Sequence, residues 1–348
     1  MPIVNLKDPE ASETLAIALR DWGFFYVTGH DIPEGVIDRA MTQSKTFFNL
    51  PLRVKRQVRA KGFNQALKTV RGHTEIRHEQ LNPQGEPDLK EVFDVGYPDT
   101  AEHYLGKNKW PVRQSANTRT QDGRETGFLT GKQDRKPLRK GKRDTDREMK
   151  HAVDSYAEYA STLAQKILGL TAKEQGCEGE FERVFGPDSL QVQRLTRYPP
   201  THEINDQKPG EIGAGVHSDY GGITILYAQG PGLHVLKPNK TSEYVEKGTF
   251  SPELEVPNSD QWIEVDSLDR TFIVMAGEAL QRLSNGQIYA VKHKVEFSGS
   301  MPRYSLAFFY DPNPEAVIEP LKCFVKSNLP LYQAKVAGHK GITRNIVR

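Results

Sequence analysis

The sequence predicts a mainly β protein with flanking helices, folded as a β sandwich or jelly roll. Three observations support this fold class. Short apolar strands recur at regular spacing from Leu190 onward, and Gly, Pro and Asn-Gly separate them. Helical patterns precede these strands, and 348 residues are enough for one large core. The expected strands read LQVQRLTRY, ITILYAQ, LHVLKP, WIEVDS, TFIVMAG, YAVKHKVEF and RYSLAFFYD.

The N-terminal part combines helices with a strand. A helix is expected to start at Asp8 and Pro9, because Asp caps helix N-termini and Pro suits the first helical position. Residues 23–30 (GFFYVTGH) predict a short buried strand, and a second amphipathic helix follows it. Residues 148–170 predict a longer helix, since their apolar residues recur at helical spacing and form one packing face.

Residues 113–147 differ in composition from the rest of the chain. They are rich in Lys and Arg and contain almost no apolar residues. Such a stretch is typical of a solvated, mobile loop, while a lid over a substrate and a polyanion site remain open alternatives. We therefore expect one compact domain with three parts: a helical and strand region at 1–111, a basic insertion or lid at 112–147, and a helix followed by the jelly-roll core at 148–348.

Composition and charge exclude several classes of protein. Lys and Arg number 47 and Asp and Glu 45, a net charge of +2, which argues against nucleic-acid binding through bulk charge. No apolar run is long enough to span a membrane, and the first residues do not resemble a signal peptide. Two cysteines, Cys177 and Cys323, cannot build a disulfide framework, so a reducing compartment is expected. We expect a cytoplasmic monomer or weak homo-oligomer that binds a small molecule and neither nucleic acid nor membranes.

His217 and Asp219 lie in the stretch GVHSDYGGITIL and are candidate metal ligands. Residues i and i+2 share a face of a strand, so the imidazole and the carboxylate would enter the same space. This pair alone is a weak signal, because His73 and Glu75 repeat the spacing. A second histidine strengthens it: His293 lies in the predicted strand YAVKHKVEF, on the apolar face that points inward.

Two histidines and one carboxylate form the facial triad of non-haem Fe(II) oxygenases, which leaves three coordination positions open. These three residues could also hold zinc, because a zinc hydrolase needs only one open coordination position. For His293 alone, a structural role in the core is the more common alternative. Arg303 and Ser305 share one face of the strand RYSLAFFYD. An inward Arg needs an anion, and a dicarboxylate such as 2-oxoglutarate fits; a salt bridge to a protein carboxylate is the alternative.

At these motifs the chain resembles the isopenicillin N synthase-like Fe(II)/2-oxoglutarate-dependent dioxygenases. The resemblance covers most of the sequence, and it implies a double-stranded β-helix (a jelly roll) in which the three candidate ligands hold iron. Arg303 and Ser305 would bind the distal carboxylate of 2-oxoglutarate. Tyr198 matches a tyrosine that hydrogen-bonds this cosubstrate, with packing on the following prolines as its alternative role. The matching segments are ALRDWGFFYVTGHDIP, LKEVFDVG, TRYPP, VHSDYGGITIL, GLHVL, WIEV, LSNGQIYAVKHKV and RYSLAFFYDPN.

The resemblance implies an enzyme that uses Fe(II), 2-oxoglutarate and O2, with ascorbate as a stimulant. Such enzymes convert 2-oxoglutarate to succinate and CO2 and oxidise an unactivated C–H bond. Hydroxylation, desaturation and oxidative ring closure are the outcomes, and many members are biosynthetic. Two departures from the family pattern stand out: Lys294 replaces the arginine that usually follows the distal histidine, and the basic stretch at 113–147 is longer than usual.

The substrate and some alternatives stay open. Arg71, His73 and Arg77 precede the LKEVFDVG segment and could reach the pocket mouth. They would then favour an acidic amino-acid derivative, whereas a solvated charged loop is the simpler alternative. Other functions to separate are fragmentation of 2-oxoglutarate itself, as in ethylene formation, a zinc hydrolase, and a non-catalytic binding module on the same fold.

Overall fold

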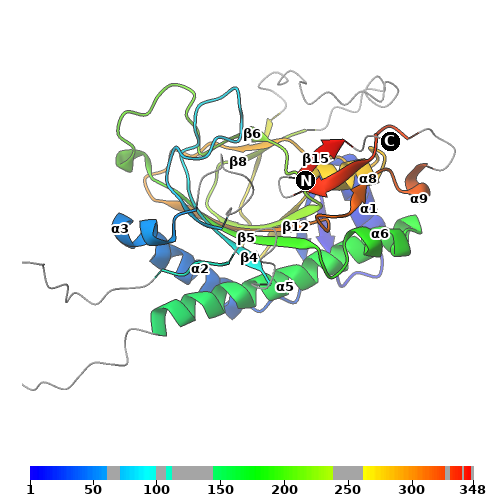
Figure 1. Ribbon diagram of the computed structural model, residues 1–348, viewed down its shortest axis with the longest axis horizontal. Helices are drawn as coiled ribbons and strands as arrows, with labels where there is room; N and C mark the ends of the chain where they lie inside the picture. Colours follow the sequence, from blue (N-terminus) through cyan, green and yellow to red (C-terminus); the bar gives the residue numbers. More distant parts are fainter. Residues whose placement is uncertain are drawn as a thin grey trace, which may run out of the picture.

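The computed structural model describes residues 1–60, 71–98, 107–111, 144–237, 262–325, 330–338 and 341–345. A large and a small β-sheet face each other, and helices run along the outer side of the large sheet (Figure 1). The expected fold class, mainly β with flanking helices and a jelly-roll core, is confirmed. Most of the basic stretch expected at 112–147 lies outside the described residues.

The large sheet has eight strands in the order β1-β2-β10-β7-β12-β5-β4-β3. Its central strand β12 pairs antiparallel with β5 on one side and with β7 on the other. N-terminal strands complete both edges, so the N-terminal and C-terminal regions share one sheet. The strands are β1 (Ile3–Asn5), β2 (Phe24–Thr28), β3 (Gly72–Thr74), β4 (Glu91–Tyr97), β5 (Leu190–Tyr198), β7 (Ile223–Gln229), β10 (Phe272–Ala276) and β12 (Arg303–Asp311).

Side chains alternate along these strands, so one face of the large sheet meets the helices and the other meets the small sheet. On β12, Leu306 and Phe308 belong to the apolar core under the helices. Arg303, Ser305 and Ala307 instead line an internal cavity between the sheets. The large sheet therefore supplies one wall of a chamber and one wall of the main core.

The small sheet has four strands in the order β6-β11-β8-β9. Its apolar side chains, such as Leu233 and Val235, pack against Leu226 and Ile273 of the large sheet. The strand expected from YAVKHKVEF is shorter in the structure, because only three of its residues pair with neighbours. The strands are β6 (Ala214–His217), β8 (Leu233–Leu236), β9 (Trp262–Val265) and β11 (His293–Val295).

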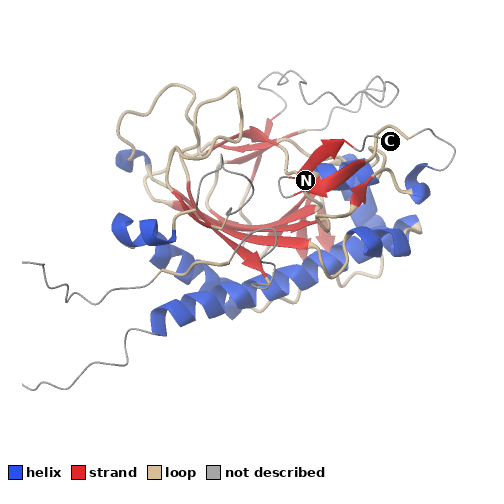
Figure 2. Ribbon diagram, in the orientation of Figure 1, coloured by secondary structure: helices blue, strands red, loops and turns tan. Residues whose placement is uncertain are grey.

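Helices cover the outer face of the large sheet, as Figure 2 shows in blue. The longest, α5, begins at Asp144 and ends at Gln175, so it extends the predicted helix at both ends. α1 begins at Ala11 rather than near Asp8, because the carboxylate of Asp8 accepts the N–H of Glu10 in a preceding turn. None of the helices in the described ranges combines the length and apolar character needed to cross a bilayer. The helices are α1 (Ala11–Asp21), α2 (Glu34–Phe48), α3 (Leu52–Lys55), α5 (Asp144–Gln175), α6 (Glu178–Val184), α8 (Glu278–Leu283) and α9 (Lys322–Val325), with 3-10 turns η1 (Arg56–Val58) and η2 (Thr201–Glu203).

A third, three-stranded sheet near the C-terminus was not expected from the sequence. It consists of β13 (Val317–Ile318), β14 (Lys335–Gly338) and β15 (Gly341–Asn345). The segment before β14 is tied to α8 and the turn after it: the hydroxyl of Tyr332 bonds to Gln281 at 3.2 Å, and Leu331 N–H donates to Asn285 Oδ1 at 2.7 Å. The C-terminal region thus supports α8, which in turn approaches the metal-ligand loop described below.

The two cysteines form a disulfide, with Cα atoms 5.8 Å apart and a sequence separation of 146. Cys177 precedes α6 and Cys323 lies in α9, and the two helices also meet through the rings of Phe181 and Phe324. This corrects the expectation drawn from the low cysteine count, because two distant cysteines pair once packing brings their helices together. The argument for a reducing compartment loses its basis.

Reduction of this disulfide should destabilise the protein. A bridge that closes a long loop restricts the unfolded chain and typically contributes about 2–5 kcal/mol. We therefore expect reductant to lower the denaturant midpoint of the wild type, measured by chemical unfolding followed by circular dichroism. The Cys177→Ser/Cys323→Ser variant serves as the control, because its midpoint should not respond to reductant. An unchanged wild-type midpoint after complete reduction would contradict the role given to the bridge.

Candidate metal centre and cosubstrate pocket

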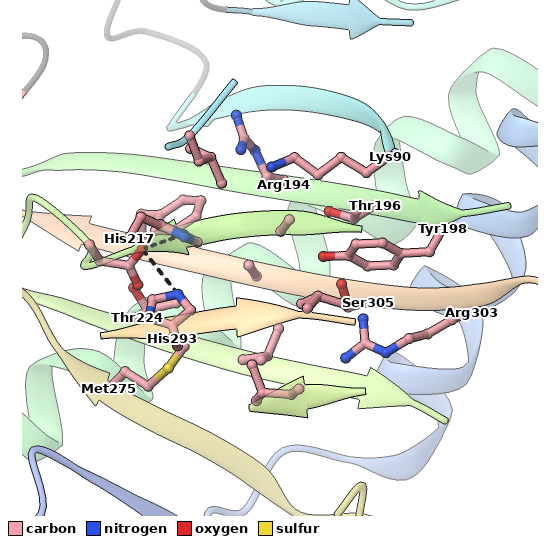
Figure 3. Close-up of a pocket in the computed structure, with 18 residues that line it drawn as sticks. Lys90, Arg194, Thr196, Tyr198, His217, Thr224, Met275, His293, Arg303 and Ser305 are labelled. Carbon is pink, nitrogen blue, oxygen red and sulfur yellow. Dashed lines mark hydrogen bonds and ion pairs between the residues drawn. The ribbon is translucent and has the colours of Figure 1, made fainter. Parts of the chain in front are cut away.

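Two strands of the small sheet and the turn after β6 bring the three candidate ligands together. His217 ends β6 and His293 begins β11, and they are partners in the antiparallel register. Asp219 follows just beyond β6, and its Oδ1 atom is 3.9 Å from Nε2 of His217 and 3.8 Å from Nε2 of His293 (Figure 3). One ligand atom from each residue lies within 4.8 Å of the other two. We call these residues the triad; a single ion can contact all three.

Hydrogen bonds to backbone carbonyls orient both imidazole rings. Nδ1 of His217 lies 2.7 Å from the carbonyl oxygen of Gly215, and Nδ1 of His293 lies 3.2 Å from that of Val291. A donating Nδ1–H leaves each Nε2 lone pair for a metal. Burial, together with the neighbouring His293, lowers the pKa of His217 to about 3. The His217 ring is therefore neutral near pH 7, the form that binds metal.

Asp219 is held through its side chain and its backbone. The hydroxyl of Thr224 on β7 donates a short hydrogen bond to Oδ2 of Asp219, so Oδ1 faces the imidazoles. The carbonyl of Asp219 accepts the N–H of Glu278 at 2.8 Å. The carboxylate of Glu278 in turn accepts a hydrogen bond from Ser218 at 2.6 Å. The first turn of α8 is thus docked on the loop that carries the ligand.

The donor set of the triad fits Fe(II). Two imidazoles and one carboxylate face one point from one side, and this arrangement would leave coordination positions for small molecules on the other side. Because Thr224 occupies Oδ2, Asp219 offers one oxygen rather than two. One-oxygen binding keeps more of the coordination sphere open than a chelating carboxylate would.

Arg303 lies at the opposite end of the cavity from the triad (Figure 3). Its side chain is 2% exposed, and Nε and Nη1 have no hydrogen-bond partner among the described residues. Burial lowers the pKa of its guanidinium, as expected for a cation without a counter-charge. The ring of Tyr198 lies 4.8 Å from Cζ, and the hydroxyl-bearing Ser305 shares the same face. The part of the chain that the structure describes supplies no carboxylate to Arg303, so a ligand carboxylate would complete this end.

A buried charge network lies along another side of the cavity. Arg194 on β5 makes two 2.8 Å bonds to Asp94 and two more to Glu79. Nζ of Lys90 lies 2.9 Å from the carboxylates of Glu79 and Asp88. Although burial opposes it, the acidic neighbours raise the pKa of both Arg194 and Lys90. Both cations line the cavity, but protein carboxylates already neutralise them, in contrast to the guanidinium at the far end.

The same network supports the strand that carries a metal ligand. Oδ1 of Asp88 accepts the N–H of Gly215 at 2.8 Å, and Oδ2 accepts the N–H of Leu81 at 3.2 Å. Gly215 has no space for a side chain, since a Cβ there would lie 2.9 Å from Cβ of Asn82. The segment before β4 therefore packs directly on β6, just before His217.

The three basic residues expected to meet the substrate do not line the described cavity. His73 on β3 faces the helix side of the sheet, where it contacts Phe47, and its Nε2 is 2.6 Å from Glu91. Arg77 forms a two-bond ion pair with Glu211 at 2.6 and 2.8 Å. Arg71 is buried and packs over β4. Because protein carboxylates engage His73 and Arg77, these two residues no longer support an acidic substrate.

Other cavity residues were not expected from the sequence. Thr224, Lys90, Arg194 and Met275 all line the cavity. A signal for Arg194 existed, since it shares a strand face with Tyr198 in LQVQRLTRY, and Thr224 closely follows the ligand motif. Strand alternation could not identify Lys90, because this residue lies before β4. Its ion pair with Glu79 holds its side chain at the cavity, and that pair depends on tertiary packing.

Two family models match this chain. The N-terminal model of non-haem dioxygenases in morphine synthesis matches residues 1–113, and the 2OG-Fe(II) oxygenase superfamily model matches residues 187–312. Homoarginine-6-hydroxylase 2-ODD-C23.1 of Arabidopsis thaliana is 27% identical over 340 residues, covering 92% of this chain and 84% of that protein. The 2-oxoglutarate-Fe(II) type oxidoreductase hxnY of Emericella nidulans is 28% identical over 322 residues, which cover 89% of this chain and 76% of that protein.

Solved structures agree. JOX2 in complex with 2OG, Fe and JA superposes with a TM-score of 0.70 at 25% identity, covering 97% of this chain and 82% of that one. A full-length Neurospora crassa protein in complex with alpha-KG gives a TM-score of 0.72 at 22% identity, covering 97% and 93%, which supports the fold. This chain therefore belongs to the 2-oxoglutarate- and Fe(II)-dependent oxygenases. It is an oxidoreductase that uses iron and 2-oxoglutarate.

Loss of the Thr224 hydroxyl should weaken metal binding. Thr224→Val keeps the side-chain shape but removes the donor to Asp219, so the carboxylate is free to rotate. Such supporting contacts typically change metal affinity by about 10–100-fold. Titration of the protein with Co(II), followed by its visible spectrum, should show this loss, while Thr224→Ser should retain near-normal affinity. Equal affinity in the Val and Ser variants would contradict this role of the hydroxyl.

Removal of the Arg303 guanidinium should weaken cosubstrate binding without affecting metal binding. Removing one side of a buried charge pair costs about 3–5 kcal/mol, which corresponds to at least about 100-fold in affinity. We expect Arg303→Ala to raise the KM for 2-oxoglutarate on this scale, measured by succinate formation. Arg303→Lys keeps the charge, so its KM for 2-oxoglutarate should lie between those of the wild type and of Arg303→Ala. A change in KM below about twofold, with Co(II) affinity unaltered, would rule out the assignment.

Proposed function

We propose that the triad holds the iron of this oxygenase and that Arg303, Ser305 and Tyr198 hold the distal carboxylate of 2-oxoglutarate. The enzyme would then hydroxylate a C–H bond of a small molecule. One observation carries the proposal: three side chains that could hold a metal ion, and a buried guanidinium to which the described residues supply no carboxylate, line one cavity at its two ends. A molecule with a carboxylate at one end and a chelating keto acid at the other matches these two ends.

The bound iron supplies the activation of O2. The chain supplies position and exclusion of water. Arg303 fixes one end of the cosubstrate, so the keto-acid end is directed toward the triad. Apolar side chains that line the cavity, among them Leu226, Leu233 and Val295, would help to exclude water from it.

We propose that the two described regions of the chain have different roles in the site. The residues assigned to iron and cosubstrate all come from the core at 148–348. The N-terminal region at 1–111 supplies Lys90 and its carboxylate partners, which line one side of the cavity and contact Gly215. Substrate selection would then depend on both regions, whereas the metal ligands themselves come from the core and the N-terminal region supports them through Asp88.

The charge network also bears on the substrate class. Three carboxylates (Glu79, Asp88 and Asp94) face two cations (Lys90 and Arg194), so this wall offers no surplus positive charge to a substrate carboxylate. We therefore favour a substrate that is neutral or cationic where it meets this wall. The name of a curated relative, homoarginine-6-hydroxylase, is in keeping with a basic amino acid. Succinate formation with homoarginine and with acidic amino acids would compare the two classes directly.

Turnover should depend on the triad. His217→Ala and Asp219→Ala should each abolish 2-oxoglutarate-dependent succinate formation, because a metal site with two protein ligands does not retain iron in the required geometry. Circular dichroism would confirm that both variants fold. His234→Ala is the matched control, since His234 also lies in the small sheet, in register with Lys294, but does not line the cavity. Full turnover in either triad variant would refute the assignment.

The competing functions predict different products. Fragmentation of 2-oxoglutarate would release a hydrocarbon gas without any second substrate, whereas a hydroxylase forms succinate and transfers one oxygen atom to its substrate. A zinc hydrolase would need neither O2 nor 2-oxoglutarate, and it would leave the buried Arg303 without a purpose. A binding module would form no succinate. Incubation with a metabolite mixture and mass spectrometry would separate these cases.

A further inference from the structure

Met275 is an oxidisable side chain inside the cavity that contains the triad. It lies on β10, lines the cavity and is 3% exposed. Its register partner on β7 is Thr224, whose hydroxyl bonds to Asp219. Met275 and the three residues of the triad line the same cavity, and Figure 3 draws Met275 among the side chains that surround it. Met275 therefore faces the cavity and is the strand neighbour of the residue that holds Asp219, whereas a methionine in the helix-side core is not.

The other methionines lie in different surroundings. The chain has five methionines; Met41 and Met149 are buried in the core on the helix side, whereas Met301 is 73% exposed. Thioethers are readily oxidised to sulfoxides, and the site of reaction follows access to the oxidant. An oxidant from solution would reach Met301 first. An oxidant generated at the triad would reach Met275 first, despite its burial.

We propose that Met275 is an internal oxidation site, modified when 2-oxoglutarate and O2 react in the absence of substrate. In that reaction O2 accepts four electrons, two from 2-oxoglutarate and two from the thioether sulfur. One oxygen atom enters succinate and the other forms the S=O bond, so the products are succinate, CO2 and methionine sulfoxide. The inference rests on the proposed function, because it requires 2-oxoglutarate turnover at the triad.

Oxidation at this position limits the enzyme's own activity. Met275 packs in the apolar layer between the sheets with Leu226 and Ile273. A sulfoxide places a polar oxygen in this layer, at the cavity that contains the triad, where burial without a donor is unfavourable. The modification therefore disturbs the metal centre and stops an enzyme that turns over without substrate. Methionine sulfoxide reductases can reverse it.

The experiment uses the full-length protein with Fe(II), 2-oxoglutarate and isotopically labelled O2, without substrate and with catalase present to remove peroxide. Peptide mass spectrometry then measures oxygen incorporation at each methionine, and succinate is measured in the same samples. We expect labelled sulfoxide at Met275 to exceed that at Met301 by at least about fivefold and to depend on 2-oxoglutarate. Met41 and Met149, equally buried but on the helix side of the large sheet, serve as internal controls.

Each outcome bears on the inference separately from the function. Succinate without label at Met275 overturns the inference and leaves the proposed function intact. The absence of both succinate and label overturns the inference alone, because the proposed function requires succinate formation only when substrate is present. Label that is equal at Met301 or independent of 2-oxoglutarate also overturns the inference, because it indicates oxidation from solution. A second measurement follows the loss of activity during pre-incubation without substrate: Met275→Leu should slow this loss, and Met301→Leu should not.

Discussion

The antiparallel pairing of β6 with β11 is the contact on which the site depends. It places His217 opposite His293, so two imidazoles from segments far apart in sequence face one carboxylate. A slip by one residue would turn an imidazole to the other face of the sheet. Both strands are short, and their register is held from outside: β8 pairs with β11 on the far side, and Asp88 binds the N–H of Gly215 on β6. The metal centre thus depends on contacts that do not touch the metal.

The contrast between two arginines on the same sheet face shows how the chain prepares a place for an anion. Arg194 and Arg303 lie on neighbouring strands, and both side chains line the cavity. Arg194 is enclosed by Asp94 and Glu79, and these carboxylates raise its pKa. Arg303 receives no carboxylate within the described residues, and burial lowers its pKa. A buried guanidinium of this kind is costly to the free protein, and this cost supports the proposal that a ligand carboxylate completes the ion pair.

The sequence was most informative about which side chains share a strand face, because alternation along the strand decides this. It predicted the fold class, and it placed Arg303 and Ser305 on one face because that relation needs no knowledge of tertiary contacts. It was weakest where distant segments meet. His73 was expected near the substrate, but the short strand β3 turns it toward Phe47, and the pairing of Cys177 with a cysteine 146 residues away followed from helix packing. Charge partners such as those of Lys90 are likewise set by packing and cannot be found from spacing alone.

The N-terminal region is integrated into the large sheet and into the lining of the cavity. Its strands β2 and β4 pair with β10 and β5 of the core, so the large sheet cannot form completely without it. Its charged residues both line the cavity and support β6. Lys90 faces the cavity, while Asp88, its partner, holds the strand that ends at His217. If this wall selects the substrate, as proposed, a substitution at Lys90 or Asp88 that alters its charge would therefore also disturb the support of β6. A substitution at Arg194 would change the charge of the same wall without acting directly on Asp88, because Arg194 bonds to Asp94 and Glu79 instead.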